Sequence, residues 1–256
     1  MSIDLEKRGA VAVMTFNRPD KRNAMSYDMR LQMERAAIEV RDDPAIRALV
    51  VTGAGDKAFC AGGDISSFDM GPLEMRDRLK QQHRTTLSLF YLEKPIVVAV
   101  NGLAVGVGFN IALLGDVIFA AEHAKFSQIY SQVGIVPDGG GLWLLAQSVG
   151  LHKAKELILT AEMIDAAQAK ALGFVREVFP KDRLLDEAMA FAEKLADGPT
   201  RALGLDKALL HRGLGIDFDS FLELESVAEV YVMQSEDHKE AIDAFMNKRT
   251  PKFKGR

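Results

Sequence analysis

The sequence predicts an α/β fold in which a repeat of strands and helices is followed by a helical C-terminal region. Four short runs before residue 122 are rich in β-branched residues and apolar at nearly every position, which is typical of strands buried on both faces of a parallel sheet. Stretches with helical spacing separate these runs, and such alternation favours a core built from βα units. After Gly150 the periodic stretches are almost all helical.

In chain order, the apolar runs predict strands at 11–16, 48–52, 96–100 and 117–121. Helices are expected between them at 25–40 and 73–92, followed by a short helix of small residues at 107–114. Beyond these, we expect one strand at 175–179 and helices at 153–159, 166–172, 184–195, 201–211, 218–234 and 239–247.

The helix expected at 218–234 has apolar residues around more of its circumference than one core-facing stripe needs. Two interpretations remain open. The helix is either the centre of a helical bundle within the chain or part of an interface between subunits.

The composition is that of an ordinary soluble globular protein. The chain has 256 residues, of which 48% are hydrophobic and 27% charged, and its formal net charge is −4. A mildly acidic protein is poorly suited to neutralising a phosphate backbone, so nucleic acid is not an expected partner.

Cys60 is the single cysteine, which excludes an intramolecular disulfide and a cysteine-rich zinc site. Charges in the first sixteen residues interrupt the apolar stretch that a signal peptide needs. No uncharged run approaches the roughly 18 residues that a membrane helix requires. We therefore expect a cytoplasmic protein with no membrane partner and no metal site.

Eight of the 21 glycines lie between residues 102 and 141, so the backbone there must turn tightly or approach another group closely. A dinucleotide-binding fingerprint fails because Ile111 stands where the third glycine of G-x-G-x-x-G is required, and a G-K-[ST] phosphate loop is absent. The remaining interpretation uses the N-terminus of the helix 107–114. Unpaired N–H groups near Val107 could hold an anion, or a carbonyl oxygen that gains negative charge.

A second tight turn is expected in the segment AFCAGGDI at 58–65, directly after the strand 48–52. Its two glycines and Asp64, a residue type that often caps helices, predict a turn that leads into a helix. Two N–H donors from separate loops are what an oxyanion hole requires.

Four segments are recognisable as a set: FCAGGDI at 59–65, KPIVVAVNGLAVGVG at 94–108, DVIFAAEHAKFS at 116–127 and GIVPDGGG at 134–141. In this order and spacing they resemble the crotonase (enoyl-CoA hydratase/isomerase) superfamily. The resemblance extends from NRPDKRNAMS at 17–26 to AFMNKRTPKFKG at 244–255. It implies the α/β crotonase-like (ClpP/crotonase) fold, a spiral core of ββα units with a C-terminal helical region.

The resemblance also implies how the chain is divided and what it binds. Residues 1–195 would form the spiral core with an acyl-CoA site, and residues 196–256 a helical extension that contacts CoA and assembles the chain into a homotrimer or hexamer. The substrate would be an acyl-CoA thioester. Because the substrate carries the CoA, no separate cofactor is expected.

By position within the family motifs, the two backbone donors that stabilise an enolate would be the N–H groups of Gly63 and Val107. Contacts to the CoA nucleotide and pantetheine would come from Lys21, Arg22, Ala24 and Ala61. Lys252 and Phe253 would reach the CoA of the same subunit or of a neighbouring one. For the lysines, simple solvation is the alternative.

The hydratases of this family use two glutamates to activate and align water. The resemblance places those glutamates at Asn110 and Tyr130, neither of which is a carboxylate, so the two-carboxylate mechanism is lost. Between residues 95 and 150 the remaining acids are Asp116 and Glu122, expected to be structural or exposed, and Asp138.

Asp138 precedes an expected helix in the segment VPDGGG, so it is either a helix N-cap or a catalytic base. The resemblance favours the base, because subfamilies with a PDGG segment here use this aspartate. They include 1,2-epoxyphenylacetyl-CoA isomerases with their double-bond-shifting relatives, and 4-chlorobenzoyl-CoA dehalogenases. One carboxylate suffices for isomerisation because it removes a proton from one carbon and returns it to another. The leading expectation is therefore an enoyl-CoA or epoxyphenylacetyl-CoA isomerase.

Three alternatives stay open. The chain could be an enoyl-CoA hydratase, as the family label suggests, or an acyl-CoA-binding protein without catalysis. In a dehalogenase-like hydrolase, Asp138 would be the nucleophile and His83, on the helix 73–92, would activate water; otherwise His83 is a packing or surface residue. Tyr130 would lie where dehalogenases place a tryptophan near the thioester. Cys60 is expected only to pack.

Overall fold

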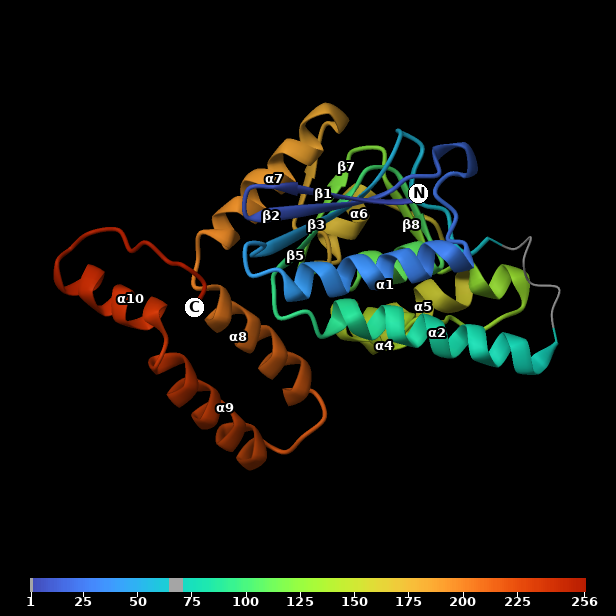
Figure 1. The fold of residues 1–256 in the computed structure, drawn as a ribbon. Coiled ribbons are helices and arrows are strands. Elements are labelled where there is room, and N and C mark those ends of the chain that lie inside the picture. The colour runs from blue at the N-terminus through green and yellow to red at the C-terminus, as the bar shows by residue number, and fades with distance from the viewer. Residues whose placement is uncertain (1, 65–70) are drawn as a thin grey trace.

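The predicted apolar runs form neighbouring strands of one sheet in the computed structural model, which describes residues 2–64 and 71–256 (Figure 1). In order across this sheet, the strands are β1 (Ile3–Arg8), β2 (Val11–Phe16), β3 (Ala48–Gly53), β5 (Ile96–Val100), β7 (Val117–Ala121) and β10 (Glu177–Phe179). β1 is antiparallel to β2, and all the other neighbours are parallel. Every residue of β3 and β5 is buried, as expected of strands that are covered on both faces.

A second sheet is built from shorter strands. In order they are β4 (Ala58–Cys60), β6 (Leu103–Val105), β8 (Lys125–Ser127) and β9 (Ile164–Asp165). β4, β6 and β8 are parallel, and β9 is antiparallel to β8.

The helices cover the larger sheet on both sides. In chain order they are η1 (Pro19–Lys21), α1 (Tyr27–Asp42), α2 (Pro72–Phe90), α3 (Val107–Ala112), η3 (Ile129–Val133), α4 (Gly141–Val149), α5 (Leu151–Thr160), α6 (Ala166–Ala171), α7 (Lys181–Ala196), α8 (Thr200–Gly213), α9 (Phe218–Met233) and α10 (Glu236–Met246). α7 packs on β2, β3, β5 and β7. Figure 1 shows α1 on the other side of this sheet, with α2 packed along α1.

The chain repeats one pattern three times: a strand of the larger sheet, a strand of the smaller sheet and a helix. The repeats are β3–β4 with α2, β5–β6 with α3, and β7–β8 with α4. Because corresponding strands are parallel neighbours, the chain segments that leave β4, β6 and β8 lie side by side. This ββα spiral brings the segments that follow β4, β6 and β8 together, and the candidate site is formed there.

Most elements lie where the sequence predicts them. The predicted strands 11–16, 96–100 and 117–121 are β2, β5 and β7, and the strand 48–52 extends by one residue in β3. The strand 175–179 is shorter, since β10 begins at Glu177. Strand β1 and the three-residue strands of the smaller sheet were not predicted from the sequence.

Helices α8, α9 and α10 extend away from the two sheets (Figure 1). α9 has no buried residue in this chain, so its interpretation as the centre of an internal bundle is wrong. Large apolar side chains remain exposed along these helices, among them Phe218 at 72% and Phe245 at 80%. The division of the chain at residue 195 stays a prediction.

Candidate active site

The loop that follows β4 and the start of α3 are in direct contact. A Cβ added to Gly108, in the first turn of α3, would lie 2.2 Å from the carbonyl oxygen of Cys60 at the end of β4. Only glycine allows this approach, because a side chain would collide with backbone. The two segments that carry the predicted oxyanion donors are therefore neighbours.

Backbone geometry leaves the predicted donors available. Gly62 (φ +103°) and Gly106 (φ +54°) have left-handed backbone that favours glycine, and they turn the chain just before Gly63 and Val107. Val107 is the first residue of α3, where the N–H group has no partner within the helix. Within the described residues, neither the Gly63 nor the Val107 N–H donates a backbone hydrogen bond. Their role as an oxyanion hole stays a prediction.

Asp64 is held by Arg18, and its expected role as a helix cap stays a prediction, since residues 65–70 lie outside the described residues. Its carboxylate accepts hydrogen bonds from both terminal nitrogens of Arg18, each at 3.2 Å. The next helix in the described residues, α2, begins at Pro72 after Gly71. Ile65, the last residue of the recognised FCAGGDI segment, lies outside the described residues.

A chain of hydrogen bonds joins the two positions of the missing glutamates to Asp138. The Tyr130 hydroxyl donates to Asp138 Oδ1 at 2.7 Å. Asn110 Nδ2 donates to the Tyr130 hydroxyl oxygen at 2.9 Å and to the Asp138 carbonyl oxygen at 2.8 Å. Gln128 Nε2 in turn donates to Asn110 Oδ1 at 2.8 Å. These four residues, the amide–tyrosine chain, fix where the Asp138 carboxylate points.

The amide–tyrosine chain is buried and tightly packed. Asn110 and Gln128 are each 1% exposed and Tyr130 is 6% exposed. A Cβ on Gly141 would lie 2.2 Å from Asn110 Oδ1, so only glycine fits beside this amide. The Tyr130 ring lies against Gly106, at the start of α3. The amide–tyrosine chain therefore connects Asp138 to the same helix terminus that presents Val107.

Burial and the Asp138 carboxylate both raise the pKa of Tyr130 well above its usual value. The phenol therefore remains protonated at neutral pH and acts as a hydrogen-bond donor to Asp138.

Asp138 is not a helix N-cap. Gly140 caps α4, without any side-chain hydrogen bond, and Gly139 and Gly140 both have positive φ. These two glycines turn the chain between Asp138 and the helix, so the carboxylate points to Tyr130 instead of to the first turn of α4.

Asp138 lies at one side of a cavity of about 460 Å³. The lining residues are Met25, Tyr27, Arg30, Asp64, Met75, Arg78, Leu79, His83, Ile135, Val136, Pro137 and Asp138. His83 is exposed and lines this cavity with Asp138, but no hydrogen bond joins the two within the described residues. Its role in catalysis stays a prediction.

Part of the predicted CoA site is assembled at the same end of the molecule. Asn23 is fully buried, and its side-chain amide donates to the Ala58 carbonyl oxygen at 2.8 Å, which holds the loop after β2 against β4. The Ala61 N–H donates to the Arg22 carbonyl oxygen at 3.1 Å. Ala24 therefore lies close to Ala61, and Lys21 and Arg22 are exposed beside them.

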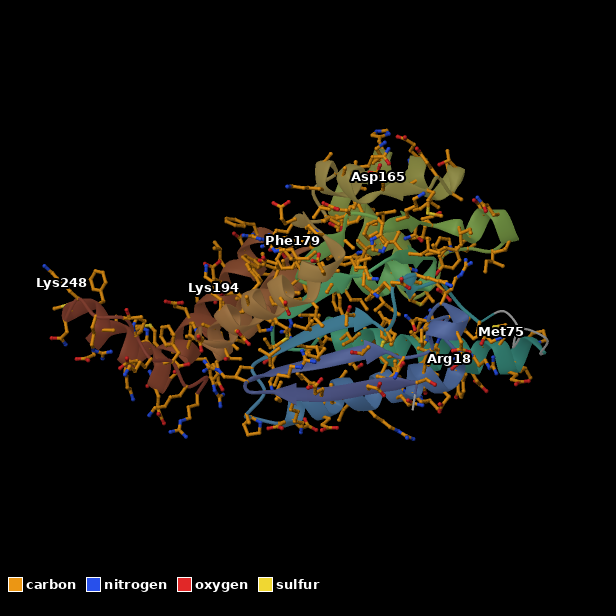
Figure 2. The ribbon with its side chains drawn as sticks, turned by 90° about the horizontal axis from the view of Figure 1, so that it is seen from above. Arg18, Met75, Asp165, Phe179, Lys194 and Lys248 are labelled. Carbon is orange, nitrogen blue, oxygen red and sulfur yellow. The ribbon has the colours of Figure 1, made fainter. Side chains whose placement is uncertain are left out.

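Lys252 and Phe253 lie at the other end of the core. The Phe253 carbonyl oxygen accepts a hydrogen bond from Arg47 Nη1 at 3.0 Å, and Arg47 directly precedes β3. Lys21, by contrast, follows β2. Because β2 and β3 are parallel, the start of one and the end of the other lie at opposite ends of the sheet. Figure 2 shows the same separation, with Arg18 and Met75 at one end and Lys248 at the other. Within one chain, the two predicted groups of CoA contacts are not brought together.

Three residues of this site, Arg30, Gln82 and Gln128, were not predicted from the sequence. Arg30 occupies what looks like an ordinary charged position on an amphipathic helix, and only the packing of α2 against α1 turns it toward the cavity. Gln128 follows a three-residue strand that has no periodic signal.

The described residues contain no cluster of three or more potential metal ligands. Burial raises the pKa of the Cys60 thiol to about 11, so this side chain is a protonated packing residue at neutral pH. None of the described helices is long and apolar enough to cross a membrane.

Comparison with known proteins agrees with the fold and the motifs. The family model described as enoyl-CoA hydratase/isomerase matches residues 6–256. A short-chain-enoyl-CoA hydratase of Clostridium acetobutylicum is 38% identical over 97% of this chain and 95% of its own. A 1,2-epoxyphenylacetyl-CoA isomerase of Escherichia coli is 35% identical over 96% and 95%. The crystal structure of an enoyl-CoA hydratase from Bacillus anthracis superimposes with a TM-score of 0.95 at 31% identity, covering 100% of both chains.

Proposed function

The chain belongs to the enoyl-CoA hydratase/isomerase family of the crotonase superfamily, and we propose that within this family of acyl-CoA-processing enzymes it is an isomerase. Its substrate would be an enoyl-CoA or an epoxyphenylacetyl-CoA thioester. Asp138 would be the acid–base group, and the N–H groups of Gly63 and Val107 would form the oxyanion hole. The CoA arrives as part of the substrate, so we propose no separate cofactor.

For an enoyl-CoA, the proposed reaction has two proton transfers. In a 3-enoyl thioester, the Asp138 carboxylate removes a proton from the carbon next to the thioester carbonyl. The electron pair moves toward the carbonyl oxygen, and the two N–H groups stabilise the resulting dienolate. Asp138 then returns the proton to the far carbon of the former double bond, which gives the 2-enoyl isomer.

The observation that carries this proposal is what replaces the glutamate pair. Asn110 and Tyr130 hydrogen bond to Asp138 and to each other. A hydratase needs two groups that deprotonate and align water, whereas here both positions orient one carboxylate. A single oriented carboxylate is sufficient for proton transfer between two carbons.

The test is the substitution Asp138→Asn, which keeps the size and the acceptor oxygen for Tyr130 but removes the base. We expect kcat/KM for conversion of 3-enoyl-CoA to 2-enoyl-CoA to fall about 100- to 10,000-fold. Asp182→Asn, an exposed position on α7, is the matched control and should retain full activity. Unchanged isomerisation by Asp138→Asn would show that Asp138 is not the base.

Enoyl-CoA hydratase is the second candidate, because most of the similar proteins found carry this activity in their names, among them relatives at 38% and 36% identity. Mass spectrometry of products from 2-enoyl-, 3-enoyl-, epoxyphenylacetyl- and 4-halobenzoyl-CoA separates the candidates, because hydration adds 18 mass units whereas isomerisation adds none. Crotonyl-CoA hydration that survives Asp138→Asn would favour the hydratase. Binding without turnover across the panel would favour a non-catalytic acyl-CoA-binding protein.

We also propose that the chain forms a homotrimer or a hexamer in the cytoplasm. The exposed apolar side chains of α9 and α10 support assembly. The distance of Lys252 and Phe253 from the rest of the proposed CoA site supports a role at a neighbouring subunit's site. Light scattering coupled to size exclusion tests the oligomeric state directly.

A further inference from the structure

The cavity beside Asp138 has mostly apolar walls but contains a guanidinium group. Its apolar lining includes Met25, Met75, Leu79, Ile135, Val136 and Pro137. Arg30 reaches the same cavity from the second turn of α1. An apolar acyl chain would leave such a cation without a new partner, which is unfavourable in a site that excludes water.

The contacts of Arg30 do not satisfy its charge. One terminal nitrogen donates to the side-chain oxygen of Gln82 on α2, a neutral acceptor. Its Nε is buried and has no acceptor among the described residues. Gln82 itself is 3% exposed, and its Nε2 is likewise buried without an acceptor there. Two unmet donors therefore occur on one pair of contacting side chains.

These donors lie close to the reacting end of the cavity. The Nε2 atom of Gln82 would be 3.0 Å from a Cβ placed on Gly139, the residue after Asp138. The charges of Arg30 and Asp138 interact electrostatically, while burial of the guanidinium lowers the pKa of Arg30. The two residues form no ion pair within 4.0 Å among the described contacts, so a group of the substrate can lie between them.

The acids that line this cavity already have other partners. Asp138 Oδ1 accepts from Tyr130, and Asp64 forms an ion pair with Arg18. A second guanidinium, that of Arg78, lies over the Tyr27 ring at 5.1 Å from its centroid, in the same lining. Two guanidinium groups and two carboxylates thus line the cavity, and the buried Nε of Arg30, which has no acceptor among the described residues, is the donor that an anionic group of a substrate would meet.

We infer that Arg30 binds a carboxylate carried by the acyl group, so that the preferred substrates are CoA thioesters of dicarboxylic acids. This inference rests on the proposed acyl-CoA function and names its substrate class. A carboxylate is the partner that best fits a guanidinium, because its two oxygens accept two parallel N–H bonds and its charge compensates the cation. Gln82 is then a positioning residue that holds the Arg30 side chain against α2.

The first experiment measures binding without turnover. Isothermal titration calorimetry compares the unreactive pairs glutaryl-CoA with pentanoyl-CoA, and adipyl-CoA with hexanoyl-CoA, in which a terminal carboxylate replaces a methyl group. We expect the wild-type protein to bind the carboxylate member of at least one pair about 10- to 100-fold more tightly. Equal or weaker binding of both carboxylate members would overturn the inference, without the need for any variant.

The second experiment uses Arg30→Met, which keeps a long unbranched side chain but removes the charge. We expect this variant to lose the preference for the carboxylate member, mainly through weaker binding of that member. Arg35→Met, at an exposed position on the same helix, should keep the wild-type preference. A preference that persists in Arg30→Met would show that another group binds the carboxylate.

Turnover separates this inference from the proposed reaction. The 3-enoyl isomers of glutaconyl-CoA and pentenoyl-CoA differ only in the terminal group, and the conversion of each to its 2-enoyl isomer is followed by NMR. If neither bond shifts while the calorimetric preference remains, the isomerase proposal fails and the carboxylate site stands. If pentenoyl-CoA reacts as well as glutaconyl-CoA and no calorimetric preference is found, the carboxylate site fails and the isomerase stands.

Discussion

Residues 110–141 bury polar side chains, whereas residues 218–246 expose apolar ones. Asn110 and Gln128 are almost inaccessible but hydrogen bond to side chains and backbone of the same chain. In α9 and α10, by contrast, Val227 is 68% and Phe245 80% exposed. The first region is complete within one chain, whereas the second has a sequence suited to contacts that one chain does not provide. The proposed chemistry and the proposed assembly therefore fall in different parts of the molecule.

The largest effect should come from disturbing the close contact beside the first region, between the start of α3 and the end of β4. In Gly108→Ala, the new methyl group would meet the Cys60 carbonyl oxygen at 2.2 Å, so α3 and the loop after β4 must move apart. We expect kcat/KM for isomerisation to fall about 100- to 1,000-fold, because both proposed oxyanion donors shift. Gly215→Ala, where the added carbon has open space, serves as the control. Comparable loss in both variants would show that the close contact is not what matters.

Arg47 joins the start of β3 to the C-terminal segment, and its loss should be the next largest effect. The guanidinium donates to Thr200 Oγ1 at 2.8 Å, to the Phe253 carbonyl oxygen at 3.0 Å and to the Gly198 carbonyl oxygen. Arg47→Met leaves these acceptors unpaired, and we expect the free energy of unfolding to fall by about 2–3 kcal/mol. Urea denaturation measures it. A change below the experimental error would mean that the C-terminal segment is held by other contacts.

A charge introduced on the exposed face of α9 should weaken self-association and leave the candidate active site unchanged. For Val227→Asp we expect weaker self-association by about 2 kcal/mol for each subunit contact, detected by light scattering over a range of concentrations. Glu229→Gln, an exposed polar position on the same helix, should leave association unchanged. Normal assembly of Val227→Asp would place the interface elsewhere.

The smallest effect concerns pH and the buried phenol. The pKa of Tyr130 is raised in the folded protein, whereas its ordinary value is 10.0. Its contribution to stability is therefore complete below pH 10 and is lost as the pH rises further, because only the unfolded chain then releases the proton. The slope approaches about 1.4 kcal/mol per pH unit.

The comparison with Tyr130→Phe isolates this effect. Unfolding free energies of the two proteins are measured between pH 9 and 11, where other groups titrate equally in both. We expect the wild-type protein to lose stability more steeply than the variant. Parallel curves would mean that the phenol ionises in the folded protein as it does in the unfolded one.

Local sequence was enough to predict elements whose environment is uniform along their length. The strands β2 and β7 were predicted to the residue because runs of β-branched residues buried on both faces have few alternatives. β4, β6 and β8 were missed because three residues show no period, and partners distant in sequence define them. β1 was missed because most of its residues are exposed and charged or polar.

The candidate site was only partly predictable for a related reason. Motif resemblance pointed to Asp138 and to the two glutamate positions, but it could not show that Asn110 and Tyr130 hydrogen bond to that aspartate. The helix-cap alternative failed because the positive φ of Gly139 and Gly140 separates Asp138 from α4. The position of Arg30 at the cavity could not be predicted, because the orientation of its side chain depends on α2, which is distant in sequence.

The close approach of Gly141 to Asn110 also limits how this enzyme can evolve. A glutamate at position 110 is one methylene longer than asparagine, and the asparagine amide already leaves no room for a Cβ on Gly141. Placing a carboxylate there by Asn110→Glu alone would displace the loop that carries Asp138. A glutamate at position 110 would therefore require helix α3 and the PDGGG loop to change together.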